Sequence, residues 1–323
     1  MGLILPKESL PEYLLEISKS LPVYAPVESE GVVKFGMYSW GDKLEFDYET
    51  TTMPPKFLFL PHGERLLEFR GDRMEESAAD GRFVVFMNII DAQALSILDE
   101  AFAGKFKDNY YFRRRESSIV AAIQNNVRMK NSFCDELDQK NRERFDLLLI
   151  DRGDCYLLEA KTQKGAALLK SGFVSKAAKK EKPKSKRKSK KLNIQKISSF
   201  LDKGPEQGMW HALADECFAC GICAYVCPIC HCFDVEDTVT LGASGSRCRN
   251  WDSCMLADFA AVAGGGNFRS RRHERIHNWY HHKFSRAVSE RGRPDCVGCG
   301  RCITFCPAKI RIHDRIRECE EAK

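Results

Sequence analysis

Residues 217–228 read CFACGICAYVCP, with four cysteines in eleven positions followed by a proline. Residues 296–307, CVGCGRCITFCP, repeat the spacing, so both stretches fit C-x2-C-x2-C-x3-C-P. The two cysteine runs are far apart in the chain, with 68 residues between Cys227 and Cys296. Because the same unusual arrangement occurs twice, we expect both copies to contribute to one structure.

The spacing of the thiols is that of bacterial ferredoxins, which hold four-iron clusters. Three thiolates separated by two residues each can surround one corner of a cuboidal cluster from a short irregular loop. The fourth, separated from the third by three residues and followed by proline, points elsewhere and ligates the other cluster in two-cluster ferredoxins. The pattern therefore predicts two [4Fe–4S] clusters, one bound by Cys217, Cys220, Cys223 and Cys306 and the second by Cys296, Cys299, Cys302 and Cys227.

Zinc is the alternative metal for grouped cysteines. Zinc sites often use two C-x2-C pairs and do not need three-cysteine runs that end in Cys-Pro, so we do not expect zinc in the two runs. Four further cysteines could together hold another metal or could be buried thiols that pack as small hydrophobes, and we prefer the second interpretation. They are Cys230, Cys232, Cys248 and Cys254. We expect the isolated Cys134, Cys155 and Cys319 to be structural or incidental.

The composition is that of a soluble globular protein, with 43% hydrophobic and 30% charged residues over 323 positions. The length predicts about two domains. The 15 cysteines are odd in number and clustered, which argues against a disulfide framework. The N-terminal residues lack the pattern of a signal peptide, and the longest apolar run, 83–90, is too short to cross a bilayer. We therefore expect a cytoplasmic protein with reduced thiols and no membrane contact.

The fold expected is α+β, with a mixed α/β N-terminal domain (1–170) followed by a mostly helical, bacterial-ferredoxin-type dicluster domain (193–323). Aliphatic and β-branched residues predict strands at 31–35, 83–90, 117–123, 145–151 and 155–161. Between them, Asp91 could cap a helix that ends near Gly104. In the C-terminal part we expect helices at 192–203, 205–216, 251–266 and 268–291, the last with arginines on a solvated face.

A basic tract separates the two domains. Residues 176–191 carry a net charge of +9, whereas the whole chain carries +6, so the remainder is mildly acidic. We interpret 171–192 as an exposed, flexible linker. The tract could bind a polyanion through counterion release, but it has no interleaved aromatic residues for base stacking. We therefore do not expect a nucleic acid partner, and a nucleic-acid-associated iron–sulfur protein remains the alternative.

Beyond these patterns, the chain resembles a known family. The resemblance lies in residues 220–237 (CGICAYVCPICHCFDVED), in 249–284 and in the second cysteine run, and less specifically in 23–28, 54–61, 108–117 and 145–169. The chain is similar to the iron–sulfur electron-transfer subunits of anaerobic sulfite reductases and to the beta subunits of cytoplasmic sulfhydrogenases. Family members often carry cysteines around 86–95 and 125–136, where only Cys134 remains here. We therefore expect no further cluster in the N-terminal domain.

The resemblance implies an electron relay between a flavin subunit that uses NAD(P)H and a catalytic subunit of sirohaem or nickel–iron type. The sequence has no dinucleotide fingerprint, P-loop or nucleophile elbow, so we see no flavin or nicotinamide site and no complete active site in this chain. A self-contained iron–sulfur reductase is the other alternative. The terminal electron donor or acceptor is not readable from the residues.

Overall fold

The computed structural model describes residues 2–48, 50–77, 81–125, 130–140, 142–176, 189–242 and 244–322. The chain forms two compact units. The first comprises residues 1–59, 78–130 and 139–188, and the second comprises 60–77, 131–138 and 189–323. Most of the basic tract lies outside the described residues, so its interpretation as a flexible linker stays a prediction.

A nine-stranded sheet forms the first unit, in the order β11-β1-β10-β9-β8-β7-β2-β3, with β4 paired to β2. Its central strands β2, β7, β8 and β9 run parallel, and the outer pairs are antiparallel. The strands are β1 (Leu3–Pro6), β2 (Val23–Ser29), β3 (Val32–Met37), β4 (Lys43–Leu44), β7 (Val84–Asn88), β8 (Ile119–Gln124), β9 (Leu147–Asp151), β10 (Cys155–Ala160) and β11 (Ser175–Lys176). All five predicted strands are confirmed. The fully buried β7 is apolar at four of its five positions, as expected of a central parallel strand.

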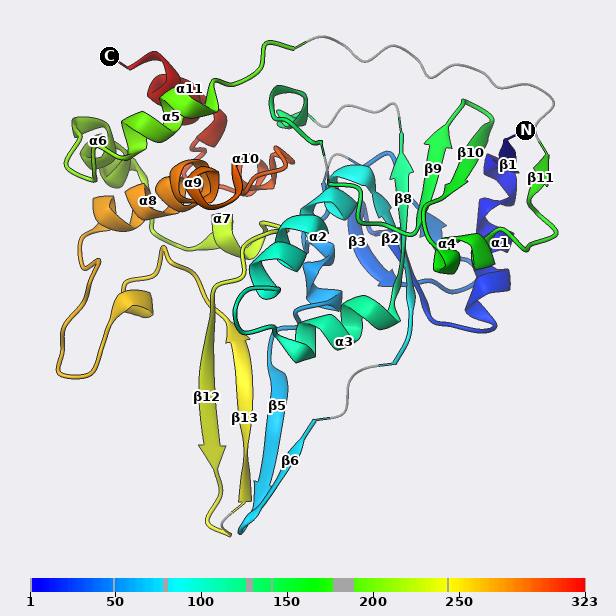
Figure 1. Ribbon diagram of the computed structural model, residues 1–323, viewed down its shortest axis with the longest axis horizontal. Helices are drawn as coiled ribbons and strands as arrows, with labels where there is room; N and C mark the ends of the chain where they lie inside the picture. Colours follow the sequence, from blue (N-terminus) through cyan, green and yellow to red (C-terminus); the bar gives the residue numbers. More distant parts are fainter. Residues whose placement is uncertain are drawn as a thin grey trace. The chain divides into compact units, whose positions relative to one another are not determined.

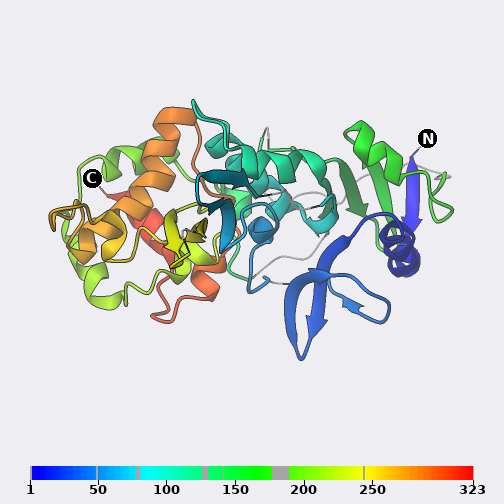
Figure 2. The same cartoon turned by 90° about the horizontal axis from the view of Figure 1, so that it is seen from below.

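The helices of this unit are α1 (Leu10–Ser18), α2 (Ile89–Phe102), α3 (Asn109–Ser117) and α4 (Gln163–Leu168). Figure 1 shows α2 and α3 in cyan and green beside the central strands, and Figure 2 shows the β2–β3 hairpin in blue from below. The helix predicted near Asp91 is confirmed, but its cap is Asn88, whose side chain accepts a hydrogen bond from the N–H of Ile90 at 3.0 Å. Asp91 is instead buried and accepts a hydrogen bond from the Tyr48 hydroxyl.

The second unit contains a four-stranded antiparallel sheet in the order β12-β13-β5-β6. Its strands are β5 (Glu64–Arg70), β6 (Arg73–Glu76), β12 (Phe233–Val239) and β13 (Ser244–Trp251), drawn in blue and yellow in Figure 1. A buried ion pair between Arg249 and Glu64 links β13 to β5, and the Trp251 indole donates to the Leu60 carbonyl at 2.7 Å. The segment 60–77 is thereby part of the second unit, although it lies early in the sequence.

Helices make up the rest of the second unit. They are α5 (Ile194–Leu201), α6 (Gly208–Glu216), α7 (Ile222–Tyr225), α8 (Arg272–His281), a π-helical turn (His282–Arg286), α9 (Ala287–Arg291), α10 (Arg301–Thr304) and α11 (Ile312–Glu321). Short 3-10 turns lie at Lys7–Ser9 and Pro55–Leu58 in the first unit and at Cys134–Glu136 and Asp258–Ala260 in the second. The predicted helices at 192–203, 205–216 and 268–291 are confirmed, the last with a later start and the π-helical turn.

The helix predicted at 251–266 is wrong. Trp251 completes β13 by pairing with Phe233, and the next N–H, of Asp252, donates to the Cys232 carbonyl at 2.9 Å. The Ser253 hydroxyl then accepts from the N–H of Met255. Because these bonds tie the backbone to other segments, the chain forms turns and the short 3-10 helix in place of a regular helix. Among the described residues, no helix is long and apolar enough to span a bilayer.

Candidate metal centre

The two cysteine runs have the same local fold. In each, a glycine with positive φ, Gly221 (+75°) or Gly300 (+80°), precedes a one-turn helix, α7 or α10. Two residues after the first cysteine the backbone is again left-handed, and its N–H points at that cysteine's sulfur. The distances are 3.3 Å in both runs, from Ala219 to Cys217 and from Gly298 to Cys296. The equal spacing in the sequence thus gives equal loops.

The first cavity joins the first run to the end of the second. The space that its lining residues outline is about 510 Å³, part of it open to solvent. Its thiols are Cys217, Cys220 and Cys223 from the first run and Cys306 and Cys302 from the second. Its other walls are mostly apolar, with Phe218, Ile222, Met255, Ile276, Trp279, Tyr280, Ile310 and Ile312 among them. The structure therefore brings together the four cysteines that the sequence assigns to the first cluster.

The second cavity has the reciprocal composition. The space that its lining residues outline is about 340 Å³, part of it open to solvent. Its thiols are Cys296, Cys299 and Cys302 from the second run and Cys227 from the first. Phe133, Pro228, Ile229, Trp279 and Val297 contribute apolar walls. The structure thus brings together the four cysteines assigned to the second cluster, and Cys302 faces both cavities.

Burial governs the protonation of these thiols in the metal-free chain. Burial is the largest cause that raises the pKa of Cys223 and of Cys296, each to about 12. Burial also raises the pKa of Cys217, and among the smaller causes is the neighbouring Cys306. These three thiols are therefore expected to be neutral without metal, and binding must displace their protons because thiolates are the ligands.

Buried donors around the cavities fit clusters that carry inorganic sulfide. Trp279 Nε1 and Tyr280 Oη are buried and have no hydrogen-bond partner within the described parts of the chain. Trp279 lines both cavities and Tyr280 lines the first. A buried donor without an acceptor reduces the stability of the fold. The sulfur atoms of a cluster can accept the hydrogen bonds that these two donors do not make within the protein. The residues present therefore fit iron–sulfur clusters.

A buried lysine adds positive charge to the second cavity. Lys283 lies in the π-helical turn, and its Nζ is 3.6 Å from Cys227 Sγ. Burial is the largest influence and acts to lower its pKa, but Cys227, Cys230, Cys296 and Asp295 together hold that pKa well above its usual value. A buried ammonium is tolerated where anions surround it, and thiolates bound to a cluster supply that charge.

A segment from the N-terminal half of the sequence supports the second run. The Gly298 carbonyl accepts hydrogen bonds from the Phe133 N–H and the Ser132 hydroxyl, both at 2.9 Å. A β-carbon placed on Gly298 would lie 2.6 Å from the N atom of Cys134. Cys134 thus lies in the segment that packs on the run. We call residues 131–134 the strap.

The remaining cysteines differ in whether they line a cavity. Cys230, Cys232 and Cys254 line a third cavity, whereas Cys248 lies on β13 and is not among its lining residues. Cys155 lies on β10 of the first unit and Cys319 is buried on α11. Neither of these last two lines any of the three cavities.

The expectation of a solvated arginine face is wrong for Arg275. This residue is 6% exposed, and its guanidinium donates to the carbonyls of Met255, Arg269 and Ser270. Arg272 donates to the Cys217 carbonyl at 3.0 Å. Arg275 and Arg272 thus anchor loops beside the first cavity, and their role is structural.

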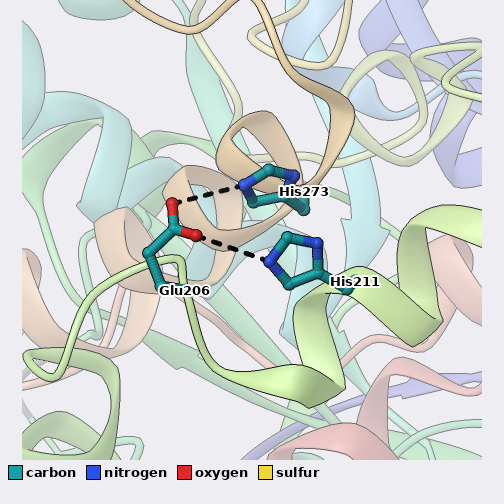
Figure 3. A group of neighbouring side chains, drawn as sticks. All are labelled: Glu206, His211 and His273. Carbon is teal, nitrogen blue, oxygen red and sulfur yellow. Dashed lines mark ion pairs between the residues drawn. The ribbon is translucent and has the colours of Figure 1, made fainter.

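A group of side chains that sequence reasoning missed lies near α6 and α8. Glu206, His211 and His273 place one donor atom each within 4.8 Å of one another, as Figure 3 shows. His211 Nε2 is 3.6 Å and His273 Nε2 is 3.5 Å from the Glu206 carboxylate. No motif marks these three positions, because residues 206, 211 and 273 come together only through helix packing.

Comparison with known proteins agrees with this geometry. A family described as a 4Fe-4S dicluster domain matches residues 216–310, and no solved structure matches the chain. The chain is 30% identical to sulfhydrogenase 2 subunit beta of Pyrococcus furiosus over 333 aligned positions, which cover 96% of this chain and 97% of that protein. The chain therefore belongs to the family of iron–sulfur electron-transfer subunits that includes the sulfhydrogenase beta subunits.

Proposed function

We propose that this chain is the electron-transfer subunit of a cytoplasmic oxidoreductase complex and relays electrons through two [4Fe–4S] clusters. The observation that carries the proposal is the reciprocal pair of cavities, each lined by the first three thiols of one run and the last thiol of the other. Each such cluster supplies one-electron redox chemistry when bound.

The protein's own residues would hold and insulate these groups. Cys217, Cys220, Cys223 and Cys306 would bind one cluster, and Cys296, Cys299, Cys302 and Cys227 would bind the other. Backbone N–H groups donate to the sulfurs of Cys217, Cys296 and Cys306 among others, and such bonds, together with burial, tune the reduction potential. The apolar walls exclude water, and Trp279 lies in the wall of both cavities.

The partners follow from the family. The relative's name is that of one component of a sulfhydrogenase, which favours a hydrogenase-type complex over sulfite reduction. We propose a flavin subunit that uses NAD(P)H on one side of the relay and a catalytic subunit of nickel–iron type on the other. A sirohaem subunit is the second candidate for the catalytic side. The first unit, which lacks the two runs, would serve assembly with these partners.

The ligand exchange between the runs can be tested with Cys306→Ala, and with Cys227→Ala as its matched reciprocal. Anaerobically prepared protein would be reduced with dithionite and measured by EPR together with iron and sulfide analysis. Cys306→Ala should damage the cluster held by the first run, and Cys227→Ala the cluster held by the second. Damage confined to the cluster of the mutated cysteine's own run would contradict the exchange.

The relay function has a separate test. The purified chain should be reduced by dithionite but should not oxidise NAD(P)H until the flavin subunit is added. Sustained NAD(P)H oxidation by the chain alone would refute the relay and favour a self-contained reductase. Co-purification with a nickel-containing or a sirohaem-containing subunit would decide between the two catalytic partners.

A further inference from the structure

The third cavity gathers thiols that neither run uses. Cys230 and Cys232 follow the first run directly, and Cys254 comes from the turns after β13. The space that its lining residues outline is about 350 Å³, part of it open to solvent, close to about 340 Å³ for the second cavity. Cys254 is 6% exposed and is hydrogen-bonded to Cys232. Three thiols from two segments therefore meet in a space as large as a proposed cluster site.

Nitrogen ligands are available in the same cavity. His231 and His282 both line it, with ring centroids 6.1 Å apart and ring planes nearly perpendicular. His231 Nδ1 is 3.0 Å from the Ile229 carbonyl. When Nδ1–H donates there, Nε2 carries the lone pair, which is the arrangement typical of metal-binding histidines. His282 comes from the π-helical turn.

We propose that Cys230, Cys232 and Cys254 bind a third metal centre, a four-iron cluster completed by an imidazole of the same cavity. Four-iron clusters take thiolate ligands, and imidazole can replace thiolate in iron–sulfur sites. The centre would share the walls formed by Trp279, Lys283 and Ile229 with the second cavity. The existence of this third centre does not depend on the proposed function. A role for it in electron transfer rests on the proposed function.

The distances between the thiols bear on the choice between a cluster and a single zinc ion. Zinc holds its thiolates at about 2.3 Å, which brings the donor atoms close together. In the described part of the chain, only Glu206, His211 and His273 bring three donor atoms within 4.8 Å of one another. The three thiols of the third cavity therefore do not all lie within that distance of one another, although Cys232 and Cys254 are hydrogen-bonded.

Charge also links the third cavity to the second. Lys283 lines both, and its ammonium is buried next to Cys227. The π-helical turn carries both Lys283 and His282, and such turns occur often at functional sites. A buried cation in the wall between two anionic centres would reduce the electrostatic repulsion between them.

The experiment counts metal in the full chain purified anaerobically. Wild-type protein should contain about twelve iron atoms and as many sulfides, and Cys254→Ser about eight. Cys248→Ser is the matched control, because Cys248 does not line the cavity, and it should keep about twelve. EPR spin integration of the reduced protein should fall by about one third in Cys254→Ser only.

The outcomes separate this inference from the proposed function. Wild-type protein with about eight irons, unchanged by Cys254→Ser, overturns the third centre and leaves the two-cluster relay intact. About one zinc per chain that is lost in Cys254→Ser, with iron unchanged, overturns the cluster in favour of a zinc site. Wild-type protein without iron overturns both proposals. Because the wild-type count is decisive by itself, the test holds even if the Cys254 variant does not fold.

A separate observation supports a second site, at Glu206, His211 and His273. His273 is 7% exposed, and its Nε2 has no hydrogen-bond partner in the described residues, only the 3.5 Å contact to Glu206. The two imidazole rings lie 4.0 Å apart, and both Nε2 atoms face the same carboxylate (Figure 3). We infer that this group binds one divalent transition metal, since two imidazoles and a carboxylate suit zinc.

The test is titration of the chelator-treated, cluster-loaded protein with Zn²⁺, followed by calorimetry. Wild-type protein should bind about one equivalent at this site, and His273→Ala should bind at least about tenfold more weakly. His281→Ala is the control, because His281 lies on the same helix but pairs with Asp202. Equal zinc affinity in wild type and His273→Ala, or no binding to the wild type, would overturn the site.

Discussion

Substitution of Gly298 by alanine tests how the strap supports the second cysteine run. Gly298 has φ +68°, and its added β-carbon would lie within 2.8 Å of backbone atoms of Phe133 and Cys134. The left-handed conformation costs an L-residue about 1–2 kcal/mol. Overpacking against backbone that cannot rotate away adds about 1–3 kcal/mol. The expected loss of stability is therefore about 2–5 kcal/mol.

Gly292→Ala is the matched control, because Gly292 has φ +70° and no atom within 4 Å of the added β-carbon. It should incur only the conformational cost. For a unit of this size each kcal/mol lowers the unfolding midpoint by about 2–4 °C, so Gly298→Ala should melt about 2–12 °C below Gly292→Ala. Anaerobic thermal unfolding followed by cluster absorbance measures the difference. Equal midpoints for the two variants would refute the contact between the strap and the run.

Three further changes test the charges of the second unit. Lys283→Met removes a buried positive charge beside Cys227 and should lower the reduction potential of the second cluster by on the order of 100 mV. Lys309 is exposed, so Lys309→Met should leave that potential unchanged, and EPR-monitored redox titrations measure both. Glu64→Gln leaves Arg249 buried without its counter-charge and should destabilise the unit by about 3–5 kcal/mol, measured by thermal unfolding; no change would contradict a buried pair. Burial lowers the pKa of His277, so the unfolded chain binds a proton there at a higher pH than the folded chain. Stability should therefore decrease as pH falls through about 6.5, and His277→Gln should flatten that dependence in unfolding midpoints measured across this range. An unchanged pH dependence in this variant would count against the burial of His277.

Local sequence patterns were sufficient to predict those strands and helices whose structure is determined by residues close in the sequence. The apolar strands β7 and β8 and the helix α2 follow from periodicity, and all lie close to their predicted bounds. The cap of α2 was misplaced, since both Asn88 and Asp91 are residues that cap helices. Only the structure shows that Asp91 is buried against Tyr48 and therefore unavailable at the helix start.

The cysteines proposed as cluster ligands could be picked out in the sequence alone, because ligand spacing along a short loop is a local property. Which segments enclose those loops was not readable. Residues 60–77 join β13 through long-range pairing, and the strap 131–134 packs on a glycine more than 160 residues away. Cys254 reaches the third cavity because hydrogen bonds to distant segments replace the helix that its neighbours favour. The spacing of the cysteines in the sequence thus identifies the proposed cluster ligands. Tertiary contacts, which no local propensity encodes, determine which segments surround those ligands.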